Sequence, residues 1–252
     1  MKNKTRYATW ALMLLLCFPL CRFRALGETP KWDFRINGGF NIGGTSPLPL
    51  PAEIRSISFS PHVLSPHVAL EVVRRLNDRW GVSMQIALDY KGFEVDSRVK
   101  NLYTEINMNE EAYIGNFTGN NTTRIHNSFV TLPVTATYRI GKRWEVQAGA
   151  YAGYLYSASF KGTASDGYIR RGSPTGEKTI VERASFDFSD KQRPFDYGLL
   201  VAGEWTFVRR FAVRGQVAWG LNPAFSSDFT GVPFRMYHVY GTLGLSYRLN
   251  TR

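Results

Sequence analysis

The sequence predicts an all-β fold: an eight-stranded antiparallel up-and-down transmembrane β-barrel, preceded by a cleaved signal peptide. Three observations predict it. The N-terminus has the features of a secretory signal, apolar and polar residues alternate in segment after segment, and short and long connections between those segments take turns along the chain. Transmembrane barrels alternate lipid-facing with lumen-facing residues, and they place short turns at one end and longer loops at the other.

The first 27 residues predict export. Three basic residues precede an apolar stretch over residues 8–21, which is too short for a convincing membrane helix. Cleavage after residue 27 would remove five basic residues and no acids, which lowers the net charge from +11 to +6. It would also remove Cys17 and Cys21, both cysteines of the chain. We therefore expect a cysteine-free mature domain over residues 28–252, without disulfides or thiolate metal sites.

Eight segments of the mature chain carry the alternation. In each, every second residue is mostly apolar and the residues between are mostly polar or small, as in a strand with one apolar face and one wet face. The segments are 34–42, 66–72, 80–91, 130–140, 144–153, 196–207, 211–221 and 240–249.

The connections between these segments predict which end of the barrel faces which compartment. Residues 77–79, 141–143 and 208–210 are short links, and the remaining segments 43–60, 92–125, 158–194 and 222–234 are expected to be long loops. Loops of this length are unusual in a compact soluble domain, whereas a membrane barrel tolerates them on its outer side. We expect both termini in the periplasm and the long loops outside the cell.

Alternation alone would also fit a soluble barrel with its apolar face inside, but two features favour an apolar exterior. Eight strands of large inward side chains would overfill a small lumen, and aromatic residues gather at strand ends, as membrane interfaces require. The aromatics expected at these interfaces are Trp80, Tyr90, Trp144, Trp205, Phe207 and Tyr237. The last strand, with Gly244, Tyr247 and Leu249, also resembles the C-terminal assembly signal of bacterial outer-membrane barrels.

The wet faces carry eleven charged residues, which we expect in the lumen. Buried charges are costly unless they are paired, and six acids nearly balance five bases. The sequence therefore predicts a salt-bridge network that fills the barrel and blocks conduction; the alternative is a proton or ion path. The residues are Asp33, Arg35, Glu71, Asp89, Lys91, Arg139, Glu145, Asp196, Glu204, Arg214 and Arg248.

Two histidines, His67 and His238, have inward parity on the strands expected to flank the first one. They are candidates for a metal or haem site at the barrel mouth. The competing interpretation is that they are ordinary rim residues, which the absence of HxxxH and HExxH spacing favours. We expect neither a metal nor a cofactor.

A family resemblance rests on three quoted segments. The stretch FVTLPVTATYRIGKRWEVQAGAYAGYL at 129–155 resembles the PorT-like outer-membrane β-barrel family of Bacteroidota, as do DYGLLVAGEW at 196–205 and FAVRGQVAWGLN at 211–222. The resemblance implies an eight-stranded outer-membrane barrel. The family's namesake is tied to export of surface proteins through the type IX secretion system, although many members have no assigned role.

Three functions remain open. The first is a non-enzymatic structural or accessory role at the cell surface, with protein export as one such role; the second is a stand-alone ligand- or adhesion-binding barrel. The third is an outer-membrane enzyme built from Asp187, Asp190, Asp228 and His126, for which no catalytic spacing argues. Expected partners are outer-membrane lipid, lipopolysaccharide, the barrel-insertion machinery, and secretion or other surface proteins. Nucleic acid is not among them, because the basic short turns would face phospholipid headgroups.

Overall fold

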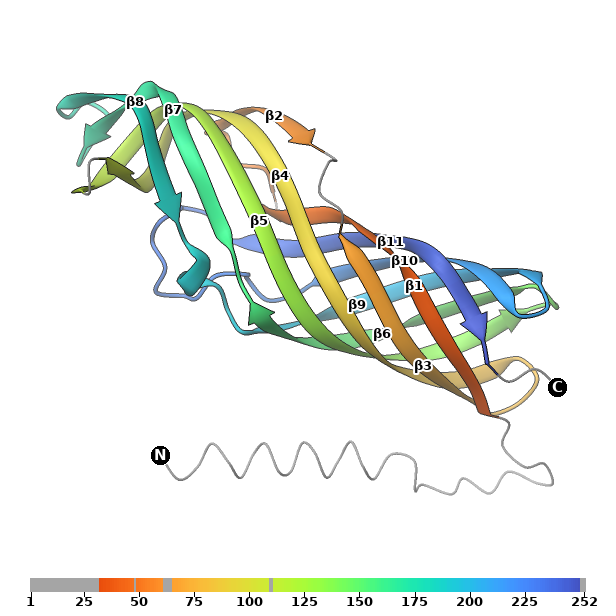
Figure 1. Ribbon diagram of the computed structural model, residues 1–252. Helices are drawn as coiled ribbons and strands as arrows, with labels where there is room; N and C mark the ends of the chain where they lie inside the picture. The colour runs from red at the N-terminus through yellow and green to blue at the C-terminus, as the bar shows by residue number, and fades with distance from the viewer. Residues whose placement is uncertain (1–31, 48, 61–64, 109–110, 250–252) are drawn as a thin grey trace, which may run out of the picture. The chain divides into compact units, whose positions relative to one another are not determined.

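The computed structural model describes residues 32–47, 49–60, 65–108 and 111–249, so the predicted signal peptide at 1–27 lies outside the described residues. The described chain is built of antiparallel strands (Figure 1) with a short 3-10 helix, η2 (Ser189–Lys191). No helix within these ranges is long and apolar enough to cross a membrane. The strands are β1 (Trp32–Pro47), β2 (Ile54–Ser60), β3 (Pro66–Arg75), β4 (Trp80–Met108), β5 (Glu111–Ile140), β6 (Trp144–Ser157), β7 (Phe160–Arg171), β8 (Lys178–Asp187), β9 (Phe195–Val208), β10 (Phe211–Gly220) and β11 (Met236–Arg248).

A subset of these strands closes into a barrel. Around the ring, β1 pairs with β3, β3 with β4, β4 with β5, β5 with β6, β6 with β9, β9 with β10, and β10 with β11, all antiparallel. The ring closes where β11 pairs with β1 from Arg35 opposite Arg248 to Pro47 opposite Met236. Closure leaves no free sheet edge within the ring, which a structure in lipid requires.

The predicted total of eight strands is wrong, because the described residues form eleven: the ring has eight, and β2, β7 and β8 are additional. Strand β2 lies in the predicted loop 43–60, and β7 and β8 lie in the predicted loop 158–194. The predicted loop 92–125 is also wrong, since β4 and β5 continue as a paired ladder through most of it. The charges of these segments resemble those of solvated loops, but they occupy the outer face of strands whose inner face is apolar.

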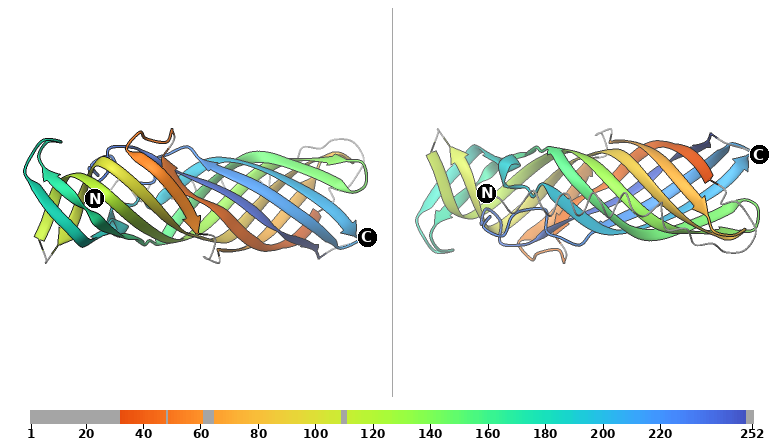
Figure 2. Two further views of the ribbon diagram at one scale, coloured as in Figure 1. Left: turned by 90° about the horizontal axis from the view of Figure 1, so that it is seen from above. Right: turned by 90° about the horizontal axis from the view of Figure 1, so that it is seen from below.

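The strands outside the ring form an extension of the barrel. We use this name for β2, β7, β8 and the described parts of β4 and β5 within residues 92–125. There β2 pairs with β4, β5 with β7, β7 with β8, and β8 returns to β4 through Asn107 and Ser185. Both views in Figure 2 show the long β4 and β5 carrying the extension beyond one end of the barrel.

The opposite end of the barrel holds the short turns. In the β3–β4 turn the side-chain oxygen of Asn77 accepts hydrogen bonds from the backbone N–H groups of Arg79 (2.9 Å) and Trp80 (2.7 Å). The β5–β6 turn begins at Gly141, whose φ of 63° is in the left-handed region that glycine enters without strain. These local features fix the hairpins without long connections.

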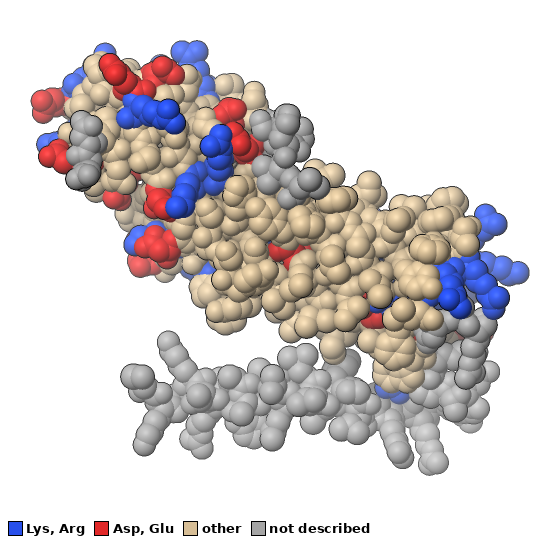
Figure 3. Space-filling model, in the orientation of Figure 1, with Lys and Arg blue, Asp and Glu red and all other residues tan. Residues whose placement is uncertain are grey.

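An apolar belt surrounds the barrel between the short turns and the extension. Leu70, Leu88, Val201 and Leu245 are among its exposed side chains, and Figure 3 shows this zone as mostly uncharged, with basic residues gathered at the short-turn end. The predicted interface residues Trp80, Trp144, Trp205 and Phe207 are exposed at that end, whereas Tyr90 and Tyr237 are half-buried near the extension. Contacting rings form an aromatic girdle at the short-turn end: Trp144–Trp205, Trp205–Phe207, Phe207–Phe211 and Phe211–Tyr247, with centroids 4.9–6.5 Å apart.

Candidate ligand-binding site

The two long strands reverse the polarity of their faces where the barrel gives way to the extension. On β4 the inward side chains within the barrel are polar, ending at Asp89 and Lys91, and they become apolar from Phe93 onward. The outward side chains change in the opposite sense, from Leu88 to the exposed Asp96 and Arg98. An apolar exterior suits lipid, and an apolar interior with a charged exterior suits water. The reversal therefore marks the boundary of the membrane-facing zone.

Within the barrel, buried Arg35 lies at the centre of a charge network. Its guanidinium donates to both carboxylate oxygens of Glu145 (Nη1–Oε1 2.9 Å and Nη2–Oε2 3.1 Å) and to Glu204 Oε2 (2.9 Å). The side chains of Glu145, Glu204 and Glu71 are almost completely buried. The arrangement gives each of these acids a basic neighbour, as a low-dielectric interior requires.

Further basic and acidic side chains surround this charge network. Arg248 donates to Glu204 (2.8 Å), and Arg214 lies 3.5 Å from Glu71. Arg75, which the sequence reasoning missed, donates to Glu145 (2.6 Å) and to Asp33 (2.8 Å). Its inward parity on β3 was the available signal. Partly exposed Arg139 lies 3.7 Å from Asp33.

A second polar group lies nearer the extension, around Lys91. The Lys91 ammonium is 3.7 Å from Asp196 Oδ2 and lies over the rings of Phe129, Tyr151 and Tyr240, 4.5–5.6 Å from their centroids. Tyr151 also donates its hydroxyl proton to Asp196 (2.9 Å). The ammonium is thus held by one carboxylate and three aromatic faces.

The two candidate histidines are both buried but have separate partners. His67 Nδ1 is 2.7 Å from Asp89 Oδ1, whereas His238 Nδ1 is 2.9 Å from Thr45 Oγ1 and its ring meets Phe129 edge-on. Within the described ranges, no group of three or more His, Cys, Asp or Glu side chains could hold a metal ion. Each histidine is thus a buried residue of the barrel interior with its own hydrogen-bond partner.

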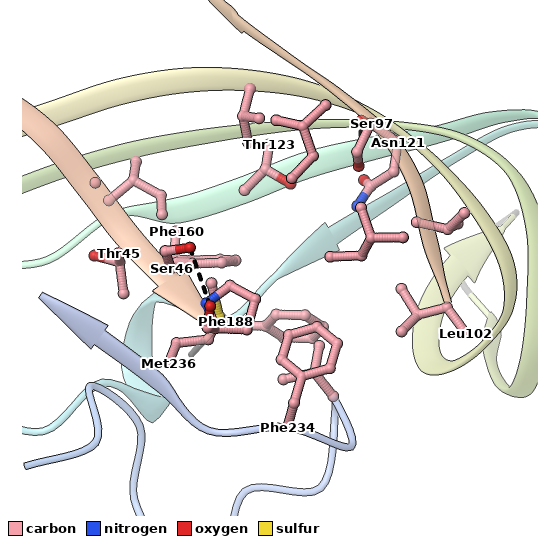
Figure 4. Close-up of a pocket in the computed structure, with 18 of the residues that line it drawn as sticks. Thr45, Ser46, Ser97, Leu102, Asn121, Thr123, Phe160, Phe188, Phe234 and Met236 are labelled. Carbon is pink, nitrogen blue, oxygen red and sulfur yellow. Dashed lines mark hydrogen bonds between the residues drawn. The ribbon is translucent and has the colours of Figure 1, made fainter. Parts of the chain in front are cut away.

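Above these polar groups, the extension and the adjoining part of β1 surround a cavity of about 440 Å³ (Figure 4). This volume falls within the range of roughly 300–1,000 Å³ that is typical of small-molecule sites. Its walls come from β1, β2, β4, β5, β7 and β8, together with Phe188 after β8 and with residues 232–236 that precede and begin β11. Two buried apolar clusters supply most of the lining, including Val99, Leu102, Ile106, Phe117, Phe160 and Phe186.

Polar groups at the cavity are few and uncharged. Ser97 and Asn121, which are paired across β4 and β5, lie together on one side, and Thr45 and Ser46 lie on another (Figure 4). The side-chain oxygen of Asn121 is buried and has no hydrogen-bond partner. None of the described residues that line the cavity carries a charge. The site can therefore accept an apolar, uncharged group and offers hydrogen bonds at a few points.

The sequence reasoning missed this cavity, because it treated the segments that form it as loops. The signal was the alternation that continues past residue 91 with its apolar side reversed: Phe93, Val95, Ser97 and Val99 occupy the inward face. Reading that face as a core would have predicted strands instead of a loop.

The four residues considered for catalysis have different local partners. Asp187 pairs with Lys161 (3.0 Å), Asp190 with Lys191 (3.2 Å), and the His126 ring stacks on Tyr90. Partial burial of Asp187 favours its protonated form, but hydrogen bonds from Ser189 and Lys161 outweigh burial and lower the pKa of Asp187. The side-chain hydrogen bond with Ser226 lowers the pKa of Asp228. Both carboxylates are therefore ionised surface groups.

Of the three residues of the predicted C-terminal assembly signal, Gly244 and Tyr247 lie on β11, which closes the barrel, and Leu249 directly follows it. Gly244 is opposite Gly39 across the β1–β11 ladder, and the backbone N–H of Leu249 donates to the carbonyl oxygen of Phe34 (2.8 Å). The Tyr247 hydroxyl accepts a hydrogen bond from Arg210 (3.2 Å). All three thus contribute to closure or to the short-turn rim.

Comparisons with known proteins give similar solved structures and one matching family model. Among solved structures, Ail of Yersinia pestis is similar in complex with the heparin analogue sucrose octasulfate (11% identity, TM-score 0.34) and alone (12%, 0.32), each match covering 88% of this chain and 100% of that one. The COG4313 outer membrane channel of Pseudomonas putida F1 is similar over 91% of this chain and 98% of its own (11%, 0.26). The comparison with curated proteins gives no significant match. A family model described as outer membrane protein beta-barrel domain matches residues 25–226, and the chain therefore belongs to this family of outer-membrane β-barrels.

Proposed function

We propose that this protein is a non-enzymatic binding protein of the outer membrane, whose barrel is an anchor and whose extension holds a small apolar ligand. The observation that carries the proposal is the cavity of about 440 Å³, lined by buried aromatic and aliphatic side chains. Such pockets with a few placed polar groups are the usual form of small-molecule sites. The charge network below the cavity supports an anchoring role for the barrel, because it fills the lumen with paired side chains.

We place the short turns, the start of β1 and the end of β11 in the periplasm, and the extension outside the cell. The polarity reversal at residues 91–93 supports an extension that stands in water, since its exterior is charged and its interior is apolar. The basic short turns suit inner-leaflet headgroups. In this orientation the ligand site faces the cell exterior.

Binding of a neutral apolar dye tests this function. The protein is placed in lipid nanodiscs and titrated with N-phenyl-1-naphthylamine, against empty nanodiscs, with fluorescence as the readout. Ala164 lines the cavity and is buried, so Ala164→Phe places a phenyl ring inside the site; Ile180 is exposed on β8, so Ile180→Phe adds the same ring outside. We expect saturable binding to the wild type and to Ile180→Phe, and loss of that binding in Ala164→Phe. Equal binding by the two variants would contradict the proposal.

The same proposal includes that the protein has no catalytic activity and binds no metal. It is supported by the separate partners of Asp187, Asp190 and His126, which do not form a nucleophile–base pair. An accessory role in type IX secretion remains a prediction that rests on the PorT-like resemblance of residues 129–155, as does an origin in Bacteroidota. Crosslinking of intact outer membranes through a tag in the β7–β8 turn, followed by mass spectrometry, tests it: recovery of secretion components would favour export, and recovery of the barrel alone would favour a self-sufficient binding protein.

A further inference from the structure

We infer that the occupant of the cavity is an acyl chain of an outer-leaflet lipid, which enters tail-first through a lateral opening marked by Ile42 and Ile57. The inference rests on the proposed function and names the class of ligand and its route. Four observations carry it: the exposure of the lining, its continuity with the belt, the strand pairing, and the charge of the cavity.

The lining reaches the surface at two side chains. Ile42 is 62% exposed and Ile57 is 47% exposed, and both line the cavity. Every other described lining residue is buried or partly buried. The opening of the cavity therefore lies beside these two isoleucines, one on β1 and one on β2.

One of the two isoleucines also belongs to the lipid-facing belt. Phe34, Ile36, Phe40 and Ile42 share the outward face of β1, and all four are exposed. The apolar surface of the belt thus runs without a polar break into the cavity lining at Ile42. A hydrocarbon chain that follows this surface can move from the bilayer into the cavity without exposure to water.

Among the described residues, no strand ladder closes the wall at this place. The β1–β3 ladder ends at Phe40 opposite Pro66, and the backbone N–H of Asn41 makes one further bond, to Ser65 (2.7 Å). Beyond that point β1 is paired with β11, and β2 is paired with β4. No ladder joins β1 to β2 in the part of the chain that the structure describes. A side chain or an acyl chain can occupy this gap without breaking backbone hydrogen bonds.

Charge decides which end of the lipid enters. The described lining has no charged side chain, so an ionised headgroup or a free carboxylate inside it would be unpaired, at a large cost in free energy. The polar end must stay outside, at the membrane surface, while the hydrocarbon tail occupies the space between Phe93, Leu102 and Phe160. Tail-first entry from the belt therefore suits a membrane lipid, whose polar end stays at the bilayer surface.

Photocrosslinking tests the inference. The mature protein is placed in nanodiscs that contain a phosphatidylcholine with a diazirine near the end of one acyl chain, irradiated, and digested for mass spectrometry. We expect adducts on cavity residues of the extension, such as Leu102 and Phe160, in addition to adducts on the belt. A second sample receives the corresponding free diazirine fatty acid at pH 7, and comparison of the two samples shows whether the chain that enters comes from a membrane lipid or from a diffusible ligand.

A matched pair of variants controls for the route. Ile57→Asp places a charge beside the opening, whereas Ser58→Asp places it on the neighbouring exposed residue that does not line the cavity. We expect cavity adducts to fall about tenfold in Ile57→Asp, the change that about 1.4 kcal/mol produces, and to be unchanged in Ser58→Asp. Equal labelling of the two variants would overturn the route.

The outcomes separate this inference from the proposed function. Lipid adducts confined to the belt, with dye binding that Ala164→Phe still abolishes, would overturn the lipid inference and leave the binding function standing. Cavity labelling by the free fatty acid but not by the lipid would likewise overturn it, in favour of a diffusible ligand. Failure of both the lipid and the dye to reach the cavity would overturn the proposed function itself.

Discussion

Arg35 on β1 and Glu145 on β6 face each other across the interior of the barrel and form a two-point ion pair, with N–O distances of 2.9 and 3.1 Å. They are 110 residues apart in the chain, and both are almost completely buried. The same guanidinium reaches Glu204 on β9. A single cation thus links three strands of the ring, and the predictions about the lumen follow from its position.

Removal of Arg35 should destabilise the barrel strongly. Arg35→Leu leaves Glu145 and Glu204 buried with one cation fewer, and breaking a buried pair of this kind costs roughly 3–5 kcal/mol. Urea unfolding in lipid vesicles, followed by tryptophan fluorescence, measures the change. The control is Lys161→Leu, which breaks the exposed pair with Asp187 and should cost about 1 kcal/mol or less. Similar losses in the two variants would mean that the interior is far more hydrated than its burial indicates.

The paired lumen should not conduct ions. Side chains fill a ring of this size, and the charges in it are held by opposite charges at 2.6–4.0 Å across the barrel. We expect no sustained single-channel current from the purified protein in planar bilayers at physiological salt, with an open porin as the positive control. A steady unitary current from the wild-type protein would contradict the plugged-lumen interpretation.

Lys91 and Asp196 should be energetically coupled. Lys91→Met leaves the Asp196 carboxylate buried without its cation, and Asp196→Asn leaves the ammonium with the aromatic rings alone. Both single variants should lose stability, and the double variant should lose less than the sum, with a coupling of roughly 0.5–3 kcal/mol. Combining Lys91→Met with the distant Lys161→Leu gives the reference, for which we expect additivity. Additive losses for Lys91 and Asp196 would show that the contact contributes little.

Substitution of Gly244 should weaken closure of the barrel. A Cβ atom on Gly244 would overlap the carbonyl oxygen of Gly38 on β1, whereas one on Gly215 of the neighbouring strand meets nothing within 4 Å. We expect Gly244→Ala to lower the yield of folded, heat-modifiable protein on gel electrophoresis and Gly215→Ala to leave it near wild type. This would give Gly244, a residue of the predicted C-terminal assembly signal, a structural role in closure of the barrel. Equal yields would show that the β1–β11 contact can shift without loss.

Several features could be read from single residues and their periodicity. Strand parity from Trp80 to Lys91 predicted which side chains face the lumen, because successive residues of a strand point to opposite faces wherever the strand goes. The same parity predicted the eleven lumen charges, of which eight are buried and Asp33, Arg139 and Arg248 lie partly exposed at the short-turn rim. It could not predict their partners, because Arg35 and Glu145 meet only through ring closure.

What the sequence by itself determined is the barrel class, the apolar exterior and the set of inward charges, since these depend on local alternation and on the length of connections. Tertiary structure alone decided that β4 and β5 continue beyond the membrane zone, that β2, β7 and β8 pair with them, and that a cavity forms inside. The physical reason is that charged, glycine- and asparagine-rich strands are locally similar to loops. Their apolar residues, such as Ile106, Phe117 and Val181, form a core only when strands distant in the chain bring them together.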